Sequence, residues 1–123
     1  MPVPFIKNIT TGVDCSGLVN LAYRMAGRDI SRDAHEQWMT AKSITAAELQ
    51  PADLIFLSRQ DAYNSISHVM LSLGGENFIE APETGKKVRR CDFKTRFCMD
   101  RQGLKAKNYI VNGKKIYCGR MLP

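Results

Sequence analysis

The sequence contains no apolar run that approaches the length of a membrane span, and no signal peptide is visible at Met1. Internal repeats and low-complexity tracts are also absent, which argues against a solenoid or a disordered linker. A chain of 123 residues is long enough to bury a hydrophobic core without disulfides. We therefore expect residues 1–123 to form a single domain, which can be part of a longer protein.

Closely spaced cysteine pairs of the zinc-binding type are missing as well. Cys91, Cys98 and Cys118 have no such partners, so we expect no metal site and no cofactor. If Cys15 stays a thiol, at most one disulfide can form among the other three cysteines. The sequence does not indicate which pair that would be, and three buried thiols are the simpler expectation.

Positive charge is concentrated in the second half of the chain. Residues 1–60 contain six Lys or Arg and six Asp or Glu, whereas residues 61–123 contain twelve and six. The resulting surplus of +6 suits an anionic polymer, although a solvated strand face explains it equally well. No stacking aromatic residues interleave with the basic ones, so we expect no nucleic-acid partner.

The run DCSGL at residues 14–18 places a cysteine where a loop is expected to become a helix. From Leu18 onward the apolar residues repeat with a helical period, and Gly27 is a typical end. Asp14 is a good N-cap, which puts Cys15 at the first helical position. Free backbone N–H groups and the helix dipole favour a thiolate there. Cys15 is therefore a candidate nucleophile, and the alternative is a small apolar residue in the first turn.

Two short strands are expected in the second half of the chain. Residues 66–73 alternate between apolar and polar side chains and include His68, and residues 78–81 include Glu80. The glycine pair between them predicts a turn. A three-residue turn sets His68 directly opposite Glu80, whereas a two-residue turn sets Val69 opposite Glu80. The first register matches apolar side chains better, so we expect it.

His68 and Glu80 complete a catalytic constellation with Cys15. A carboxylate that accepts a hydrogen bond from one imidazole nitrogen orients the other nitrogen toward a nucleophile. Taken alone, His68 can be a half-buried strand histidine and Glu80 a solvated edge carboxylate, but the combination is much less frequent by chance. His35 is an alternative base in a second expected helix, and we expect it on the surface.

The chain resembles the NlpC-type cell-wall peptidases, which are bacterial papain-like cysteine hydrolases of the peptide stems of peptidoglycan. Four blocks carry this resemblance, in the family's order, over about residues 12–90. The blocks are Gly12–Val19 around the cysteine, Leu49–Phe56, the histidine strand His68–Gly74, and Phe78–Pro82 followed by Thr84–Lys86.

The resemblance implies a papain-like α+β fold, in which the N-terminal helix with the cysteine packs on a small antiparallel β-sheet. It implies hydrolysis of the amide between the γ-carboxyl of D-glutamate and a diamino acid such as diaminopimelate. Cys15 would attack the amide carbon, His68 would be the base and then the acid, and Glu80 would orient His68. Asp14 and Ser16 would bind the free amine of the substrate, unless Asp14 serves only as a helix cap.

The implied partner is a peptidoglycan stem peptide or a released muropeptide. An intact wall as substrate would place the protein outside the cytoplasm, in the periplasm or the cell wall. Released fragments would allow a cytoplasmic recycling role instead.

Three residues depart from the family's pattern. Glu80 stands where the family usually has histidine, asparagine or glutamine, and Ala52 stands where it commonly has glycine, which we interpret as a backbone feature. Phe5 is the only aromatic residue near the place of an upstream tyrosine, and no Gly-Gly pair accompanies it. Two alternatives therefore remain: an amidase or acyltransferase on the same fold, or a catalytically inactive basic module that binds the cell wall.

Overall fold

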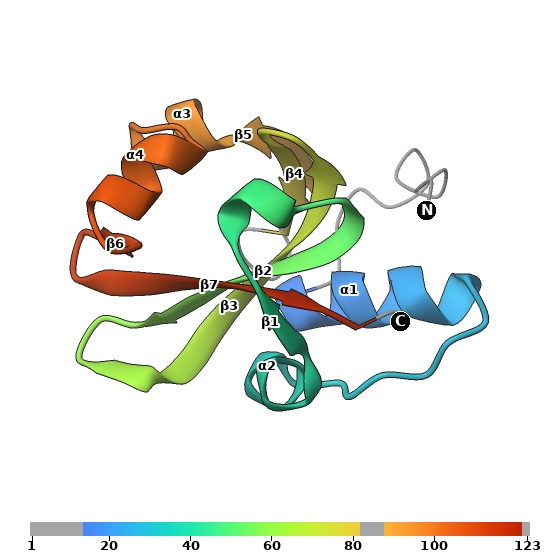
Figure 1. Ribbon diagram of the computed structural model, residues 1–123. Helices are drawn as coiled ribbons and strands as arrows, with labels where there is room; N and C mark the ends of the chain where they lie inside the picture. The colour runs from blue at the N-terminus through green and yellow to red at the C-terminus, as the bar shows by residue number, and fades with distance from the viewer. Residues whose placement is uncertain (1–13, 82–87, 122–123) are drawn as a thin grey trace.

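The computed structural model describes residues 14–81 and 88–121. In this part of the chain, helices and strands alternate irregularly along the sequence (Figure 1). Their bounds are α1 Cys15–Met25, α2 Ala34–Thr40, β1 Lys42–Ile44, the 3-10 helix η2 Ala46–Glu48, β2 Pro51–Arg59, β3 Ala62–Gly74, β4 Asn77–Glu80, β5 Arg89–Asp92, α3 Phe93–Phe97, α4 Arg101–Ala106, β6 Ile110–Val111 and β7 Lys114–Arg120.

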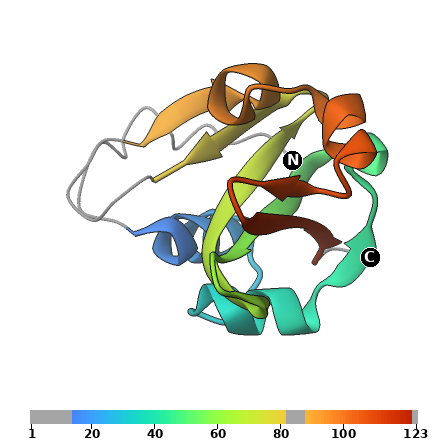
Figure 2. The ribbon, with the colours of Figure 1, turned by 90° about the vertical axis from the view of Figure 1, so that its left-hand side faces the viewer.

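The described strands form one antiparallel sheet in the order β1-β7-β2-β3-β4-β5, with β6 paired to β7 beside it. Helices α1 and α2 pack against β3 on one face of this sheet, and α3 and α4 lie on the other side (Figures 1 and 2). The expected α+β fold, with the cysteine helix packed on an antiparallel sheet, is confirmed. None of the helices in the described residues is long and apolar enough to cross a membrane.

Alternating side chains of the central strands give the protein two hydrophobic cores. Val69 and Leu71 of β3 face α1, where they pack with Leu18 and Val19. Met70, between them in the sequence, faces the opposite core. That core contains the mutually packed rings of Phe78, Phe93 and Phe97 together with Leu104 of α4.

Helix α1 begins where the sequence predicts it to begin. The side chain of Asp14 accepts a hydrogen bond from the backbone N–H of Gly17 at 2.7 Å, so Asp14 is the N-cap and Cys15 is the first helical residue. The helix ends at Met25, and Gly27 then adopts a positive φ of 82°. Glycine adopts this conformation without a steric penalty, which explains its place at the helix end.

The register predicted for β3 and β4 is wrong by two positions. In the structure Leu71 pairs with Ile79 and Gly74 pairs with Asn77, with an irregularity between Ser72 and Gly74. Both glycines of the turn have positive φ, 93° at Gly74 and 61° at Gly75, and this accommodates an extra residue that strict alternation does not predict. Continued along the strands, this register puts Glu80 opposite Met70 and diagonal to His68, which is still within reach on the same face.

Ala52 adopts a backbone conformation that favours glycine. Its φ is +79°, and its side chain is almost fully buried near the start of β2. The hydroxyl of Tyr23 in α1 donates a hydrogen bond to the carbonyl oxygen of Ala52. This contact ties the strained residue to the cysteine helix, and it agrees with the interpretation of Ala52 as a backbone feature.

Candidate active site

His68 and Glu80 are joined by a short hydrogen bond across β3 and β4. The Nε2 atom of His68 lies 2.7 Å from Oε2 of Glu80, and the side chains are 14% and 0% exposed. Since Glu80 is ionised, Nε2 carries the proton and donates it to the carboxylate. The other ring nitrogen, Nδ1, is therefore the atom that can exchange a proton with a nucleophile.

Cys15 reaches His68 because β4 ends at Glu80. Beyond that residue the outer edge of β3 has no β4 partner, so the start of α1 can approach His68 and the backbone N–H of Val69. Burial alone would raise the pKa of the Cys15 thiol. Hydrogen bonding to His68, the positive charge of His68 and the backbone N–H groups of Val69 and Ser16 outweigh it and hold that pKa below its ordinary value.

The protonation of His68 reflects both neighbours. Burial would lower the pKa of His68, but hydrogen bonds and charge interactions with Cys15 and Glu80 raise it to about 9. The two pKa shifts together favour the ion pair of a Cys15 thiolate and a His68 imidazolium over the neutral pair. The structure thus brings together the three residues that the sequence nominates as nucleophile, base and orienting group.

The second oxygen of Glu80 is bound by two arginines that the sequence analysis did not single out. Arg89 of β5 donates to Oε1 from Nη2 at 2.7 Å and from Nε at 3.1 Å, and Arg96 of α3 donates from Nε at 3.0 Å. The thiol of Cys91 lies 3.6 Å from the same oxygen. Burial opposes ionisation of Glu80, yet the hydrogen bonds from His68 and Arg89 and the charge of Arg96 lower its pKa to about 2.

Asp14 and Ser16, which the resemblance assigns to the substrate amine, lie beside Cys15 but already have a partner. Arg32 donates from Nη1 to Oγ of Ser16 at 2.9 Å, and its Nη2 lies 3.0 Å from Oδ1 of Asp14. The same Asp14 oxygen caps α1 through Gly17. A substrate amine at this position would have to share Asp14 with a guanidinium group.

His35, the alternative base, has a different hydrogen-bond partner. Its Nδ1 accepts a hydrogen bond from the backbone N–H of Ile66 at 3.1 Å, and its ring centroid lies 5.3 Å from that of Trp38. Because Nδ1 is engaged by β3, His35 supports the wall of the site rather than acting on Cys15. The expected surface position is only partly met, since the residue is half-buried.

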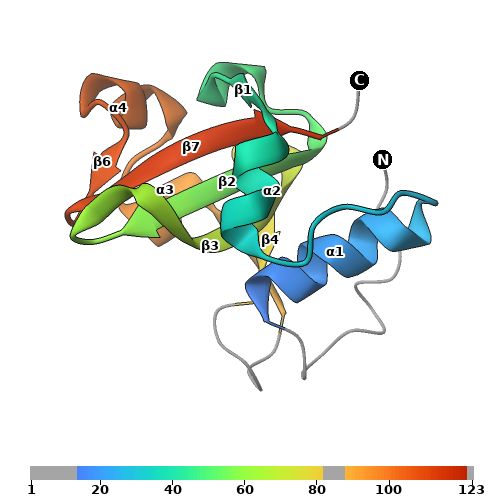
Figure 3. The ribbon, with the colours of Figure 1, turned by 90° about the horizontal axis from the view of Figure 1, so that it is seen from below.

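A cleft of about 560 Å³ opens next to Cys15. Its lining comes from the start of α1, the segment that leads into α2, the last residue of β2 and residues 66–67 within β3. Figure 3 shows how α1 and α2 lie beside β3. The lining includes two arginines from distant parts of the chain. The lining residues are Asp14, Cys15, Ser16, Arg32, Asp33, Ala34, Arg59, Ile66 and Ser67.

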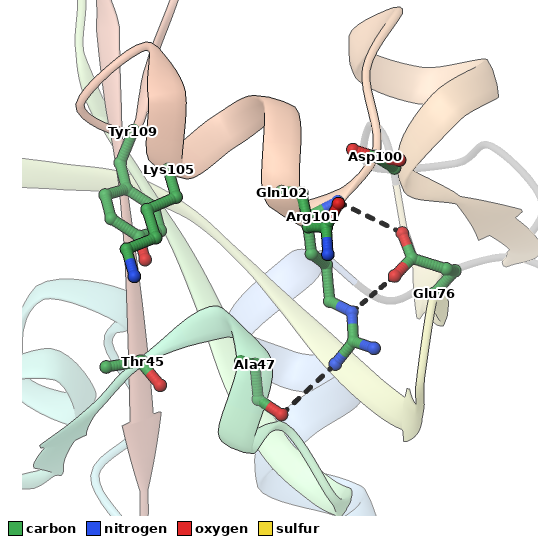
Figure 4. Close-up of a pocket in the computed structure, with 8 residues that line it drawn as sticks. All are labelled: Thr45, Ala47, Glu76, Asp100, Arg101, Gln102, Lys105 and Tyr109. Carbon is green, nitrogen blue, oxygen red and sulfur yellow. Dashed lines mark hydrogen bonds and ion pairs between the residues drawn. The ribbon is translucent and has the colours of Figure 1, made fainter.

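A second cavity, of about 600 Å³, lies between η2, α4 and the turn after β3 (Figure 4). It contains none of the three site residues. Arg101 crosses it, binding both carboxylate oxygens of Glu76 and the carbonyl oxygens of Ala46 and Ala47 at 3.0 and 3.4 Å. Nε and Nη1 of the guanidinium, together with the backbone N–H of Arg101, are thus bound within the protein, and the contacts join η2 to α4, so we assign this cavity a structural role.

The four cysteines are all free thiols in the described residues. Cys118 is buried, which raises the pKa of its thiol to about 12, and Cys91 is half-buried beside Glu80. Cys98 is exposed, so the expectation of three buried thiols is met by Cys118 alone. The described residues contain no group of three His, Cys, Asp or Glu side chains that could hold a metal ion.

Comparison with known proteins places this geometry in a family. The model of the NlpC/P60 family matches residues 5–106. The chain belongs to the NlpC/P60 family. Phe5, which stands near the place of the family's upstream tyrosine, lies outside the residues that the structure describes.

Several members are peptidoglycan hydrolases by name. The gamma-D-glutamyl-L-lysine dipeptidyl-peptidase of Bacillus subtilis is 32% identical over 77 residues, which are 63% of this chain and 26% of that protein. The murein DD-endopeptidase MepH of Escherichia coli is 37% identical over 82 residues, which are 64% of this chain and 30% of that protein. The chain therefore spans less than a third of the length of either relative.

Solved structures share the fold. An NlpC/P60 family protein from Bacillus cereus superposes with a TM-score of 0.70 at 26% identity, covering 91% of this chain and 32% of that one. RipD from Mycobacterium tuberculosis, described as a non-catalytic NlpC/p60 domain protein, superposes with a TM-score of 0.62 at 23% identity and covers 89% of this chain and 67% of its own. At that identity RipD shows a shared fold alone.

Proposed function

We propose that this NlpC/P60 domain is a cysteine peptidase that hydrolyses the peptide stems of peptidoglycan, with Cys15, His68 and Glu80 as its catalytic triad. The observation that carries the proposal is the position of His68, which interacts with Cys15 on one side and with the buried Glu80 on the other. A surface histidine and an edge carboxylate would not need this arrangement, whereas nucleophilic catalysis does.

The chemistry follows from the protonation states. The Cys15 thiolate attacks the amide carbon of the substrate, and the carbonyl electrons move onto the oxygen. The backbone N–H of Cys15, at the start of α1, is a candidate donor to this oxyanion. His68 then transfers its Nδ1 proton to the leaving amine, the C–N bond breaks, and a thioester with Cys15 remains.

Water completes the cycle. Neutral His68 takes a proton from a water molecule that attacks the thioester carbon, and the Cys15 thiolate leaves as the acid product forms. Glu80 stays ionised throughout and keeps Nε2 of His68 protonated, so that Nδ1 is always the nitrogen that exchanges protons.

The amide after γ-D-glutamate is the bond that we assign. A γ-linked D-glutamyl residue keeps a free α-carboxylate close to the scissile amide, and Arg59 and Arg32 line the cleft beside Cys15. Guanidinium groups suit carboxylates. The name of the Bacillus subtilis relative also specifies a γ-D-glutamyl bond, whereas MepH is named for a different linkage. An intact wall as substrate would place the protein outside the cytoplasm, whereas released stem fragments would allow a cytoplasmic recycling role.

The deciding experiment uses the tripeptide L-Ala-γ-D-Glu-diaminopimelate. We expect the wild-type protein to release diaminopimelate, detected by mass spectrometry, and the Cys15→Ala variant to release none. Cys98→Ala is the matched control, because this exposed thiol lies outside the site, and it should retain activity. With a muramoyl-linked stem as a second substrate, release of the peptide from muramic acid would instead indicate an amidase, and transfer of the acyl group to an added amine would indicate an acyltransferase. No reaction with any stem peptide would favour a binding module.

A further inference from the structure

Glu80 is held by more groups than a carboxylate needs to orient one histidine. Oε2 accepts a hydrogen bond from His68. Oε1 accepts three hydrogen bonds from two arginines, which lie on different elements. We propose that Arg89 and Arg96 are positioning residues of the triad, which fix the Glu80 carboxylate so that one oxygen faces His68 alone. This inference rests on the proposed function.

The burial of Glu80 makes this arrangement necessary. The side chain is 0% exposed, and an isolated carboxylate in such a place would favour the neutral acid. Protonated Glu80 could rotate and donate a proton instead of accepting one from Nε2, and His68 would lose its defined tautomer. Arginines avoid this outcome because they remain charged and match a carboxylate geometrically.

Within residues 14–81 and 88–121, the charged and titratable groups of the cluster around His68 and Glu80 come from four elements. They are Cys15 of α1, His68 of β3, Arg89 and Cys91 of β5, and Arg96 of α3. With Cys15 as thiolate and His68 as imidazolium, the two arginines leave the cluster with a surplus of positive charge. That surplus makes the imidazolium a better acid toward the leaving amine than a lone carboxylate would allow.

Removal of one arginine therefore has a defined effect on pH dependence. Arg96→Gln removes a positive charge, which should raise the pKa values of Cys15 and His68. Both the rising and the falling limb of the plot of kcat/KM against pH should therefore move to higher pH. We expect kcat to fall by roughly tenfold, as is typical for the loss of an orienting partner, with KM little changed.

Lys94→Gln is the matched control, because Lys94 lies on the same helix, is exposed and carries the same charge. Lys94→Gln should leave both limbs of the kcat/KM profile at the pH values of the wild type. Arg96→Lys retains the charge and should return the pH profile to that of the wild type. An Arg96→Gln profile identical to that of Lys94→Gln would overturn the proposal.

A double substitution separates positioning from general packing. In a Glu80→Gln background Arg96 has no carboxylate to hold, so the added Arg96→Gln change should leave kcat unaltered. An equal loss in both backgrounds would overturn the proposal. Because Arg96 also lies 5.0 Å from the ring of Phe97, Arg89→Gln with Arg90→Gln as its control provides a second pair if Arg96→Gln does not fold.

A readout without substrate keeps this inference distinct from the proposed function. The pH dependence of Cys15 alkylation by iodoacetamide, followed at the Cys15 peptide by mass spectrometry, should move to higher pH in Arg96→Gln but not in Lys94→Gln. An unmoved alkylation profile refutes the role of the arginines, whereas absence of tripeptide cleavage by the wild type refutes only the assigned reaction.

Discussion

Glu80 and His68 carry charges that depend on each other, and this coupling has a consequence for stability. Despite their burial, mutual hydrogen bonding and neighbouring charges lower the pKa of Glu80 from 4.5 to about 2 and raise that of His68 from 6.5 to about 9. The contribution of Glu80 is complete above pH 4.5 and is lost as the pH falls toward 2. The contribution of His68 is complete below pH 6.5 and is lost as the pH rises through 9.

We therefore predict that the free energy of unfolding is greatest between pH 4.5 and 6.5. Toward pH 2 the wild type should lose about 3 kcal/mol through Glu80, measured by urea unfolding at a series of pH values. Glu80→Gln should be less stable at pH 6 and should show a flatter acid limb. Glu36→Gln, at an exposed carboxylate of α2, is the control and should keep the slope of the wild type. Equal slopes in wild type and Glu80→Gln would contradict the assignment of the ion pair.

At the scale of single elements, strand β2 contains the most evident backbone strain. Ala52 combines a φ of +79° with nearly complete burial. Glycine has no Cβ and adopts this conformation freely, so we predict that Ala52→Gly raises the free energy of unfolding by about 1 kcal/mol.

Urea or thermal unfolding measures the effect of Ala52→Gly. Ala62→Gly in β3 is the matched control, since Ala62 is not among the residues with positive φ and the added flexibility should lower stability there. Destabilisation of similar size at both positions would show that the Ala52 conformation carries no strain.

The β3–β4 hairpin shows how far sequence patterns determine this site. Alternation correctly places His68 and Glu80 on one face, because the two-residue period of a strand is a local property. The pairing register depends on an irregularity between Ser72 and Gly74. The sequence pattern does not indicate how many residues such a bulge leaves unpaired. The predicted contact survives because a diagonal pair is still within reach of two long side chains.

The arginine partners of Glu80 were beyond sequence reasoning for a different reason. Arg89 and Arg96 belong to a basic stretch, and charge runs generally lie in solvent. Only the pairing of β5 with β4, which sets Glu80 opposite Arg89, and the position of α3 bring these side chains to the Glu80 carboxylate. The N-cap of α1, by contrast, follows from a single local residue, Asp14, and is predicted correctly.

At the scale of the whole molecule, the cleft beside Cys15 joins parts of the chain that are far apart in sequence. Arg59 contributes from the end of β2, where its Nε donates to Oγ of Ser65 at 3.0 Å. Because Arg59 lines the cleft, we expect its remaining guanidinium nitrogens to bind an anion there. The cleft thus combines Cys15 from the start of α1 with a positive charge from the end of β2.

We predict that Arg59→Gln weakens recognition of the free α-carboxylate of γ-D-glutamate. The wild type should show a lower KM for L-Ala-γ-D-Glu-diaminopimelate than for the α-amide analogue, and Arg59→Gln should reduce that preference by roughly tenfold. Arg28→Gln, at an exposed arginine outside the cleft, should retain it. An undiminished preference in Arg59→Gln would show that another group binds the carboxylate.

The position of the site between the two cores also has a consequence for folding. Cys15 packs with the core on the α1 side, whereas Glu80 is held by Arg96 from the opposite layer. A folding chain that has docked α1 but not α3 would have a buried carboxylate lacking one of its partners and a cysteine without its full activation. The proposed activity therefore requires that both layers have docked, whichever of them docks first.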